Sequence, residues 1–197
     1  DYKNMSDQDE AKFRMIEYHK WKFKAKIFSP LAPLTGKRTP VLMTRVEYGF
    51  LGSYNKYKKS PFETFYMGGD GMSGYSSTYA TETIGLRGYE NGSIAGNGGY
   101  NSYGYAYSRL SMELRYPFLL EPSSTIYGLV FVEAGNAWRD LKDFNPFQLK
   151  RSAGVGVRIF LPMIGLMGID WAYGFDRPDG YDQRGGSNFH FIIGQEF

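Results

Sequence analysis

Few residues in this chain have the types and spacing that catalysis requires. The 197 residues include two histidines, His19 and His190, which lie at opposite ends of the chain, and no cysteine. Neither histidine belongs to a recognisable nucleophile or metal-binding motif. The acids of residues 176–182 form an ordinary turn-rich loop with a faint resemblance to cation-binding loops, and clusters of acids with metal-ligand spacing are missing. The sequence therefore predicts a protein that is not an enzyme and that has no metal site and no cofactor.

One cation stands out because it lies among glycines in the longest irregular segment, residues 52–102. This residue is Arg87, and its neighbours are Leu86, Gly88 and Tyr89. A guanidinium offers five N–H donors in a planar fork, and inside a protein it needs carboxylate partners to offset its desolvation. The chemistry to expect here is ionic binding, and the next question is which elements supply the acids.

The composition favours strands and turns over helices. Aromatic residues make up 18% of the chain, with 17 Tyr, 15 Phe and 3 Trp, and there are 25 Gly. These types are typical of strands and of the turns between them. No run of 18 apolar residues occurs, which excludes a transmembrane helix, although a barrel with alternating faces can have a polar average. The net charge of +3 is too small to indicate binding to nucleic acid.

Seven segments alternate apolar and polar residues with the period of two that is typical of strands. They span residues 18–28, 41–52, 103–117, 125–138, 151–161, 166–175 and 189–197. On nearly every segment one face is charged or glycine, and the other is aromatic or aliphatic. The connections also alternate, with short ones at 29–40, 117–124 and 162–165 and longer ones at 52–102, 138–150 and 176–187.

This two-faced pattern predicts an all-β fold, an antiparallel transmembrane β-barrel with lipid outside and a wet lumen inside. A soluble β-sandwich would also alternate, but it does not explain the outward-facing Trp21 and Trp171 or the alternating connections. Seven strands are an odd number, and open edges in lipid leave backbone groups unsatisfied. We therefore expect residues 18–197 to be the C-terminal portion of a larger barrel. Residues 1–17 are then a loop, the end of a missing upstream strand, or a hidden eighth strand.

The strands that follow the long loop carry the candidate partners of Arg87. Glu113 and Glu133 lie on the polar, lumen-facing sides of neighbouring strands. We expect the loop to fold into the lumen with Arg87 bound to both acids. The alternative is a mobile external loop, with the acids paired to other lumen cations such as Arg109 or Lys24.

Several motifs resemble those of BamA-type outer-membrane insertases. The segment Leu86-Arg87-Gly88-Tyr89 resembles the hydrophobic-Arg-Gly-aromatic motif of that family's long sixth extracellular loop. Residues 61–69, Pro-Phe-Glu-Thr-Phe-Tyr-Met-Gly-Gly, are similar to the stretch that precedes the motif. The last strand, which includes Phe189, Phe191, Gly194 and the terminal Phe197, is similar to the family's closing strand. The resemblance spans residues 18–197 and implies about the last seven strands of a sixteen-strand barrel, with a long loop folded into the lumen.

The resemblance also implies roles for individual residues. Arg87 takes the place of the motif arginine, and Glu113 and Glu133 take the places of its two acidic partners. The second partner is usually Asp in the family, so Glu133 brings a longer side chain. In the family the closing strand forms a lateral gate, where Gly194 would allow a bend. A glycine that makes room for a neighbouring aromatic ring is the other interpretation of Gly194.

The function implied by the resemblance is assembly and insertion of β-barrel proteins into the bacterial outer membrane. The implied partners are outer-membrane lipid, unfolded outer-membrane protein clients and periplasmic accessory lipoproteins, with no nucleic acid. Two alternatives remain open, namely a related barrel that secretes a partner polypeptide and a small porin or adhesin barrel. An insertase is expected to carry periplasmic POTRA domains before the barrel, whereas a porin carries none.

Overall fold

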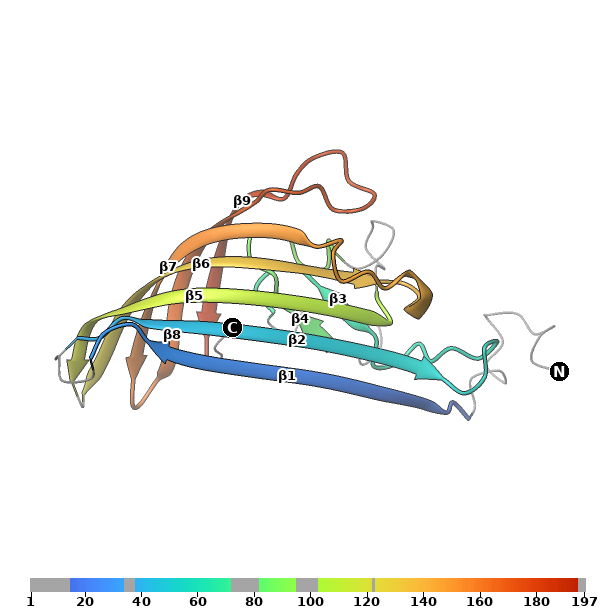
Figure 1. Ribbon diagram of the computed structural model, residues 1–197, viewed down its shortest axis with the longest axis horizontal. Helices are drawn as coiled ribbons and strands as arrows, with labels where there is room; N and C mark the ends of the chain where they lie inside the picture. Colours follow the sequence, from blue (N-terminus) through green and yellow to red (C-terminus); the bar gives the residue numbers. More distant parts are fainter. Residues whose placement is uncertain (1–14, 34–37, 72–81, 95–102, 122, 195–197) are drawn as a thin grey trace.

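A single curved sheet of seven antiparallel strands dominates the computed structural model, which describes residues 15–33, 38–71, 82–94, 103–121 and 123–194 (Figure 1). The sheet order is β1-β2-β5-β6-β7-β8-β9. Its strands are β1 (Tyr18–Pro30), β2 (Val41–Ser53), β5 (Ala106–Glu121), β6 (Ser124–Trp138), β7 (Lys150–Leu161), β8 (Gly165–Gly174) and β9 (Gly186–Ile193). Among the described residues, β1 and β9 each pair with one neighbour, so the sheet has two edges and is not closed.

The predicted seven strands and their order are confirmed, but several boundaries differ, most of all those of the third and the last long strand. The third long strand does not end at Pro117, because β5 continues to Glu121 and the turn before β6 is correspondingly shorter than predicted. The pairing with β6 shifts register between Pro117 and Leu119. A proline cannot donate to the ladder, and a bulge accommodates it without ending the strand. The last strand starts at Gly186, three residues before the predicted start, and Phe197 lies outside the described residues.

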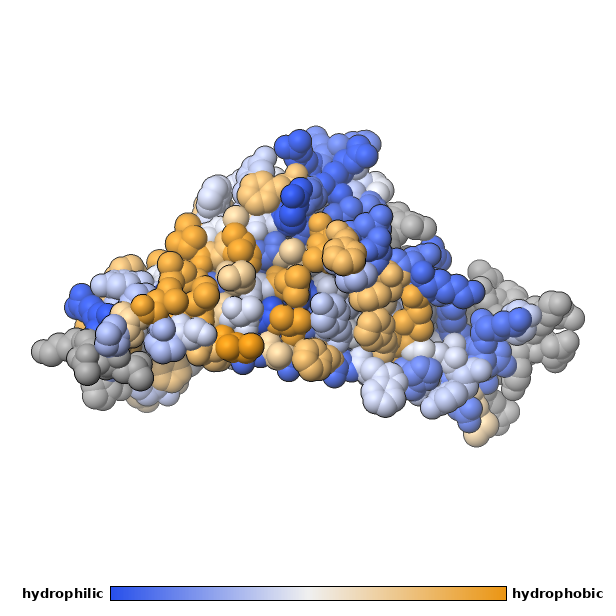
Figure 2. Space-filling view, viewed as in Figure 1, coloured by the Kyte–Doolittle hydropathy of each residue, from blue (hydrophilic) through white to orange (hydrophobic). Residues whose placement is uncertain are grey.

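The two faces of the sheet differ as the alternation predicts. On β2, Arg45 and Glu47 are only 2% exposed on the concave face. Trp21 and Val130, on the convex face, are 68% and 56% exposed. Figure 2 shows the near face with hydrophobic residues across its middle. No helix among the described residues is long and apolar enough to cross a membrane.

The concave face is covered by part of the segment between β2 and β5. This segment contains a short parallel pair, β3 (Phe65–Met67) and β4 (Glu82–Ile84), which lies behind the sheet in Figure 1. The sequence pattern had indicated only irregular structure here. Three-residue strands are too short to show a period, which is why alternation did not reveal them.

Candidate loop-docking site

The loop between β2 and β5 reaches the wall through a hydrophobic core of its own. Phe65 and Met67 of β3 and Ile84 of β4 are at most 6% exposed, and they pack with Leu86 and Ile94. The wall completes this cluster with Leu51, Tyr107 and Ala137. Backbone hydrogen bonds fix the chain on both sides of the motif, from Leu86 N to Gly69 O (3.1 Å) and from Ile94 N to Met67 O (3.1 Å). Burial of this apolar surface holds the motif against the sheet.

Arg87 lies at the centre of the docked loop and is fully buried. Its Nη2 contacts Glu113 Oε1 (2.5 Å) and Glu133 Oε1 (2.7 Å), while Nη1 contacts Asp170 Oδ2 (2.9 Å). The backbone N–H of Arg87 also donates to Glu133 Oε2 (3.0 Å). The guanidinium carbon sits 3.5 Å from the centre of the Phe131 ring, in a cation–π contact.

These contacts set the charge state of the arginine. Burial alone disfavours the charged form of Arg87, but the carboxylates of Glu133, Glu113 and Asp170 outweigh burial and raise the pKa of Arg87 above its ordinary value. Arg87 is therefore a permanent cation, bound by three strands of the wall at once. Geometry of this kind suits a structural clasp and offers no nucleophile or acid–base pair.

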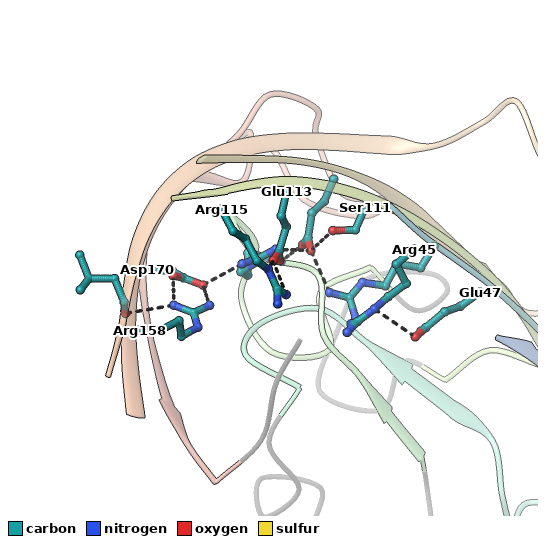
Figure 3. A network of polar contacts seen from close by, with 11 residues as sticks. Arg45, Glu47, Ser111, Glu113, Arg115, Arg158 and Asp170 are labelled. Carbon is teal, nitrogen blue, oxygen red and sulfur yellow. Dashed lines mark hydrogen bonds and ion pairs between the residues drawn. The ribbon is translucent and has the colours of Figure 1, made fainter. Parts of the chain in front are cut away.

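Each of the three acids also binds an arginine of the wall. Arg109 Nη2 contacts Glu133 (2.8 Å), Arg115 Nη2 contacts Glu113 (2.7 Å) and Arg158 contacts Asp170 (2.5 Å). Figure 3 shows this network along the inner face, from Asp170 and Arg158 to Arg45 and Glu47. The clasp, defined as Arg87, its three acids and these three wall arginines, thus contains four guanidinium groups and three carboxylates. Each acid pairs with one arginine of the wall besides Arg87.

The residues after Arg87 fix the backbone of the motif. Gly88 has φ +88°, a conformation that side-chain-bearing residues rarely adopt, and its N–H donates to His190 Nε2 (2.9 Å) on β9. The Tyr89 hydroxyl donates to Arg151 O (2.6 Å) and accepts from Asp176 N (3.3 Å). Burial of the Tyr89 hydroxyl raises its pKa to about 12, so it remains a donor. The motif therefore reaches the start of β7, the connection between β8 and β9, and β9 itself, as well as the middle of the sheet.

The structure brings together the motif residues and both acids singled out from the sequence. It does not place the acids with Lys24, which contacts Glu47 instead (3.1 Å). Arg109 does bind Glu133, but alongside Arg87 and not in its place. The loop is docked, in contrast to the alternative of a mobile external loop.

Two partners of the motif were missed by sequence reasoning. Asp170 lies on the polar face of the alternating segment 166–175, but the sequence does not connect it with Arg87, and it shows His190 only as an isolated histidine. The signal that could have found both residues is the alternation of inward and outward side chains along each strand. Asp170 is the single charge on an inner face of glycine and alanine, and His190 alternates with the outward Phe189 and Phe191.

The described residues predicted for the closing strand lie on one face of β9 or just after its end. Phe189 and Phe191 are 67% and 58% exposed on the outer face of β9. Gly194 follows the strand with φ +72°, and a Cβ there would meet no described residue within 4 Å. The interpretation that Gly194 makes room for an aromatic ring therefore has no support among the residues that the structure describes. The positive φ of Gly194 is the physical reason for a glycine here, and its N–H donates to Leu166 O (2.7 Å).

Comparisons with known proteins agree with this geometry. The family model of the Omp85 superfamily domain matches residues 13–197. A solved structure of BamA from Haemophilus ducreyi, lacking POTRA domains 1–3, matches with a TM-score of 0.61 and 21% identity. That match covers 89% of this chain and 35% of the BamA chain, so this chain spans about a third of its length. No curated protein sequence matches.

The fold is that of the C-terminal part of the BamA barrel, and the family and fold together indicate an outer-membrane β-barrel protein. The buried arginine and the loop docked on the inner wall are the arrangement that the resemblance in the sequence implies. The chain belongs to the Omp85 superfamily.

Proposed function

We propose that this chain is the C-terminal barrel portion of a protein that assembles and inserts β-barrel proteins into the bacterial outer membrane. It would act without enzymatic chemistry. The observation that carries the proposal is the fully buried Arg87, which joins an inward-folded loop to Glu113, Glu133 and Asp170. In this proposal residues 18–197 form barrel wall and loop, and residues 1–17 belong to the end of an upstream element.

The edge strand β9 is the proposed site of insertion. It is eight residues long and pairs only with β8 in the described part of the chain. An unpaired edge offers a row of N–H and C=O groups that an incoming strand can bind by β-augmentation. A lateral gate would open there when β9 separates from the first strand of the complete barrel, with Gly194 as the bend beside it.

The docked loop would hold this edge in position. The Gly88 N–H donates to His190 on β9, while Arg87 anchors the same loop to β5, β6 and β8. The loop thus bridges the movable edge and the fixed wall. Unfolded outer-membrane proteins are the proposed clients, and periplasmic accessory lipoproteins are proposed partners.

Depletion of the full-length protein in its own cells tests this function. We expect many unrelated outer-membrane barrels to decrease together, as measured by quantitative proteomics of outer membranes, and a plasmid copy with Arg87→Ala to restore them poorly. Loss of one secreted polypeptide, with barrels unchanged, would instead indicate the secretion alternative. Loss of permeability or adhesion alone would indicate a porin or adhesin.

A further inference from the structure

The connection between β6 and β7, residues 139–149, lies on the outer side of the wall. Phe144 packs edge-to-face against Tyr48 (6.4 Å between centroids), Phe50 (5.0 Å) and Trp138 (4.7 Å). Tyr48 and Phe50 alternate with the inward-facing Glu47, so their rings point outward. The connection therefore folds down over the convex face instead of extending beyond the rim.

Polar contacts hold residues 139–149 in this position. Asn136 Nδ2 donates to Gln148 O (2.7 Å), and Lys59 Nζ pairs with Asp140 (2.8 Å). Beneath the connection, the outward positions Ala106 and Ser108 of β5 are at most 1% exposed. On β6 the outward Val130 and Val132, farther from the connection, are 56% and 53% exposed. The connection thus covers the end of the apolar outer face and is continuous with it.

The outer surface of this connection combines apolar and cationic side chains. Phe147 is 93% exposed and Leu141 is 40% exposed. Phe147 N donates to Asn145 Oδ1 (3.1 Å), which fixes the turn that presents the ring. Arg139, Lys142 and Asp143 are exposed beside them, and Asp140 pairs with Lys59. The three cations of this surface, counting Lys59, therefore outnumber its two acids. Aromatic and basic residues at the end of an apolar band are suited to the boundary between acyl chains and phosphate headgroups.

We infer that residues 139–149 form a lipid anchor seated in the headgroup layer of the leaflet at the loop end of the barrel. Phe147 and Leu141 contact the acyl boundary, and Arg139 and Lys142 face lipid phosphates. This inference rests on the proposed function, because an anchor in the headgroup layer requires that the barrel lie in the outer membrane. Lipid fits this surface better than a protein partner because the surface continues the apolar outer face.

Spin labelling of the full-length protein in bilayers tests the anchor. The chain has no cysteine, so Phe147→Cys can carry a nitroxide once any cysteine elsewhere in the protein is replaced. Matched labels go on Val132→Cys, on the outer face, and on Asp179→Cys, in the connection between β8 and β9. We expect the ratio of collisions with oxygen to collisions with a water-soluble nickel chelate to be several-fold higher at 147 than at 179, and highest at 132.

The outcomes separate this inference from the proposed function. A ratio at 147 equal to that at 179, with 132 in lipid, overturns the anchor but leaves the barrel in the membrane. A label at 132 that collides freely with the nickel chelate overturns the membrane placement itself. A label at 147 protected from both reagents in native membranes, but not in lipid vesicles, points to a protein partner and also overturns the anchor.

The lipid charge is tested with the same label. Vesicles rich in phosphate-bearing anionic lipids should reduce the mobility of the label at 147 more than zwitterionic vesicles do, and Lys142→Glu should abolish that difference. Equal mobility in both kinds of vesicle would show that Arg139 and Lys142 do not bind lipid phosphates.

Discussion

At the scale of single residues, the charge balance of the clasp decides which substitutions it tolerates. Four arginines share three carboxylates, so the buried network already has one cation in excess. Removing an acid leaves two cations in excess, whereas removing Arg87 restores the balance. The motif arginine therefore attaches the loop, and the wall does not need it to satisfy its own charges.

This asymmetry predicts an order of stability. Glu133→Gln should destabilise the full-length protein by about 3–5 kcal/mol, because the buried Arg87 and Arg109 both lose the carboxylate that they share. Arg87→Met should cost less, about 1–3 kcal/mol, because each acid keeps a wall arginine. Urea unfolding in detergent micelles measures both. An Arg87→Met variant less stable than Glu133→Gln would show that the wall depends on the loop for its charge balance.

At the scale of elements, the loop and β8 meet backbone to backbone. A Cβ at Gly174 would lie 2.3 Å from Gly88 O, and a Cβ at Gly88 would lie 2.9 Å from Gly174 N. The paired glycines let the motif approach the end of the strand closely enough for Tyr89 and His190 to make their hydrogen bonds.

Gly174→Ala should therefore undock the loop, at a cost of about 1–3 kcal/mol for overpacking. Gly128→Ala is the matched control, because its Cβ would meet only the side chain of Phe118, at 2.7 Å on the outer face. Protease cleavage of the loop in the folded barrel should rise in Gly174→Ala and stay near wild type in Gly128→Ala. Equal cleavage in the two variants would contradict the close approach.

A second contact ties the loop to β1. Lys20 and Lys22 each pair with Glu82 of β4 (2.8 Å), and Lys20 also pairs with Glu63 (2.7 Å). Burial disfavours the Glu82 carboxylate, but the two ammonium groups outweigh burial and hold the pKa of Glu82 below its ordinary value of 4.5. The lysine face of the first strand thus binds the loop from the side opposite to Arg87.

The sign of this pKa shift gives a pH dependence. A lowered pKa in the folded state means that Glu82 stabilises the protein above about pH 4.5 and loses this effect as the pH falls through the folded value. The melting temperature of wild type should exceed that of Glu82→Gln near neutral pH, and the difference should shrink below about pH 4.5. A difference that is constant with pH would exclude an ionic contribution from Glu82.

At the scale of the whole molecule, the two edges of the sheet are the dominant feature. β1 and β9 have one partner each in the described structure, and unpaired edges are unsatisfied in an apolar environment. Residues 18–197 expressed alone should aggregate or form oligomers by edge pairing. Light scattering after size-exclusion chromatography in detergent measures this. A stable monomer from the isolated segment would show that β1 and β9 can pair with each other.

The sequence by itself determined the strands, their order and their two faces. A period of two assigns each side chain to a face, and Glu113, Glu133 and Asp170 all lie on the predicted inner side. It also identified the motif around Arg87, because a lone cation among glycines needs acidic partners. It misplaced the end of β5, since Pro117 normally interrupts a strand and only the bulge beside it lets pairing continue.

Tertiary structure alone decided which inner residues meet. Asp170 is 83 residues from Arg87, and His190 is 102 residues from Gly88, so no local pattern connects them. Curvature of the sheet brings β8 and β9 over the loop, and the glycine contact sets how deep the loop lies. The folding of residues 139–149 onto the outer face was equally invisible, because Phe144 finds its aromatic partners on two strands that are separated in the chain by the long loop and β5.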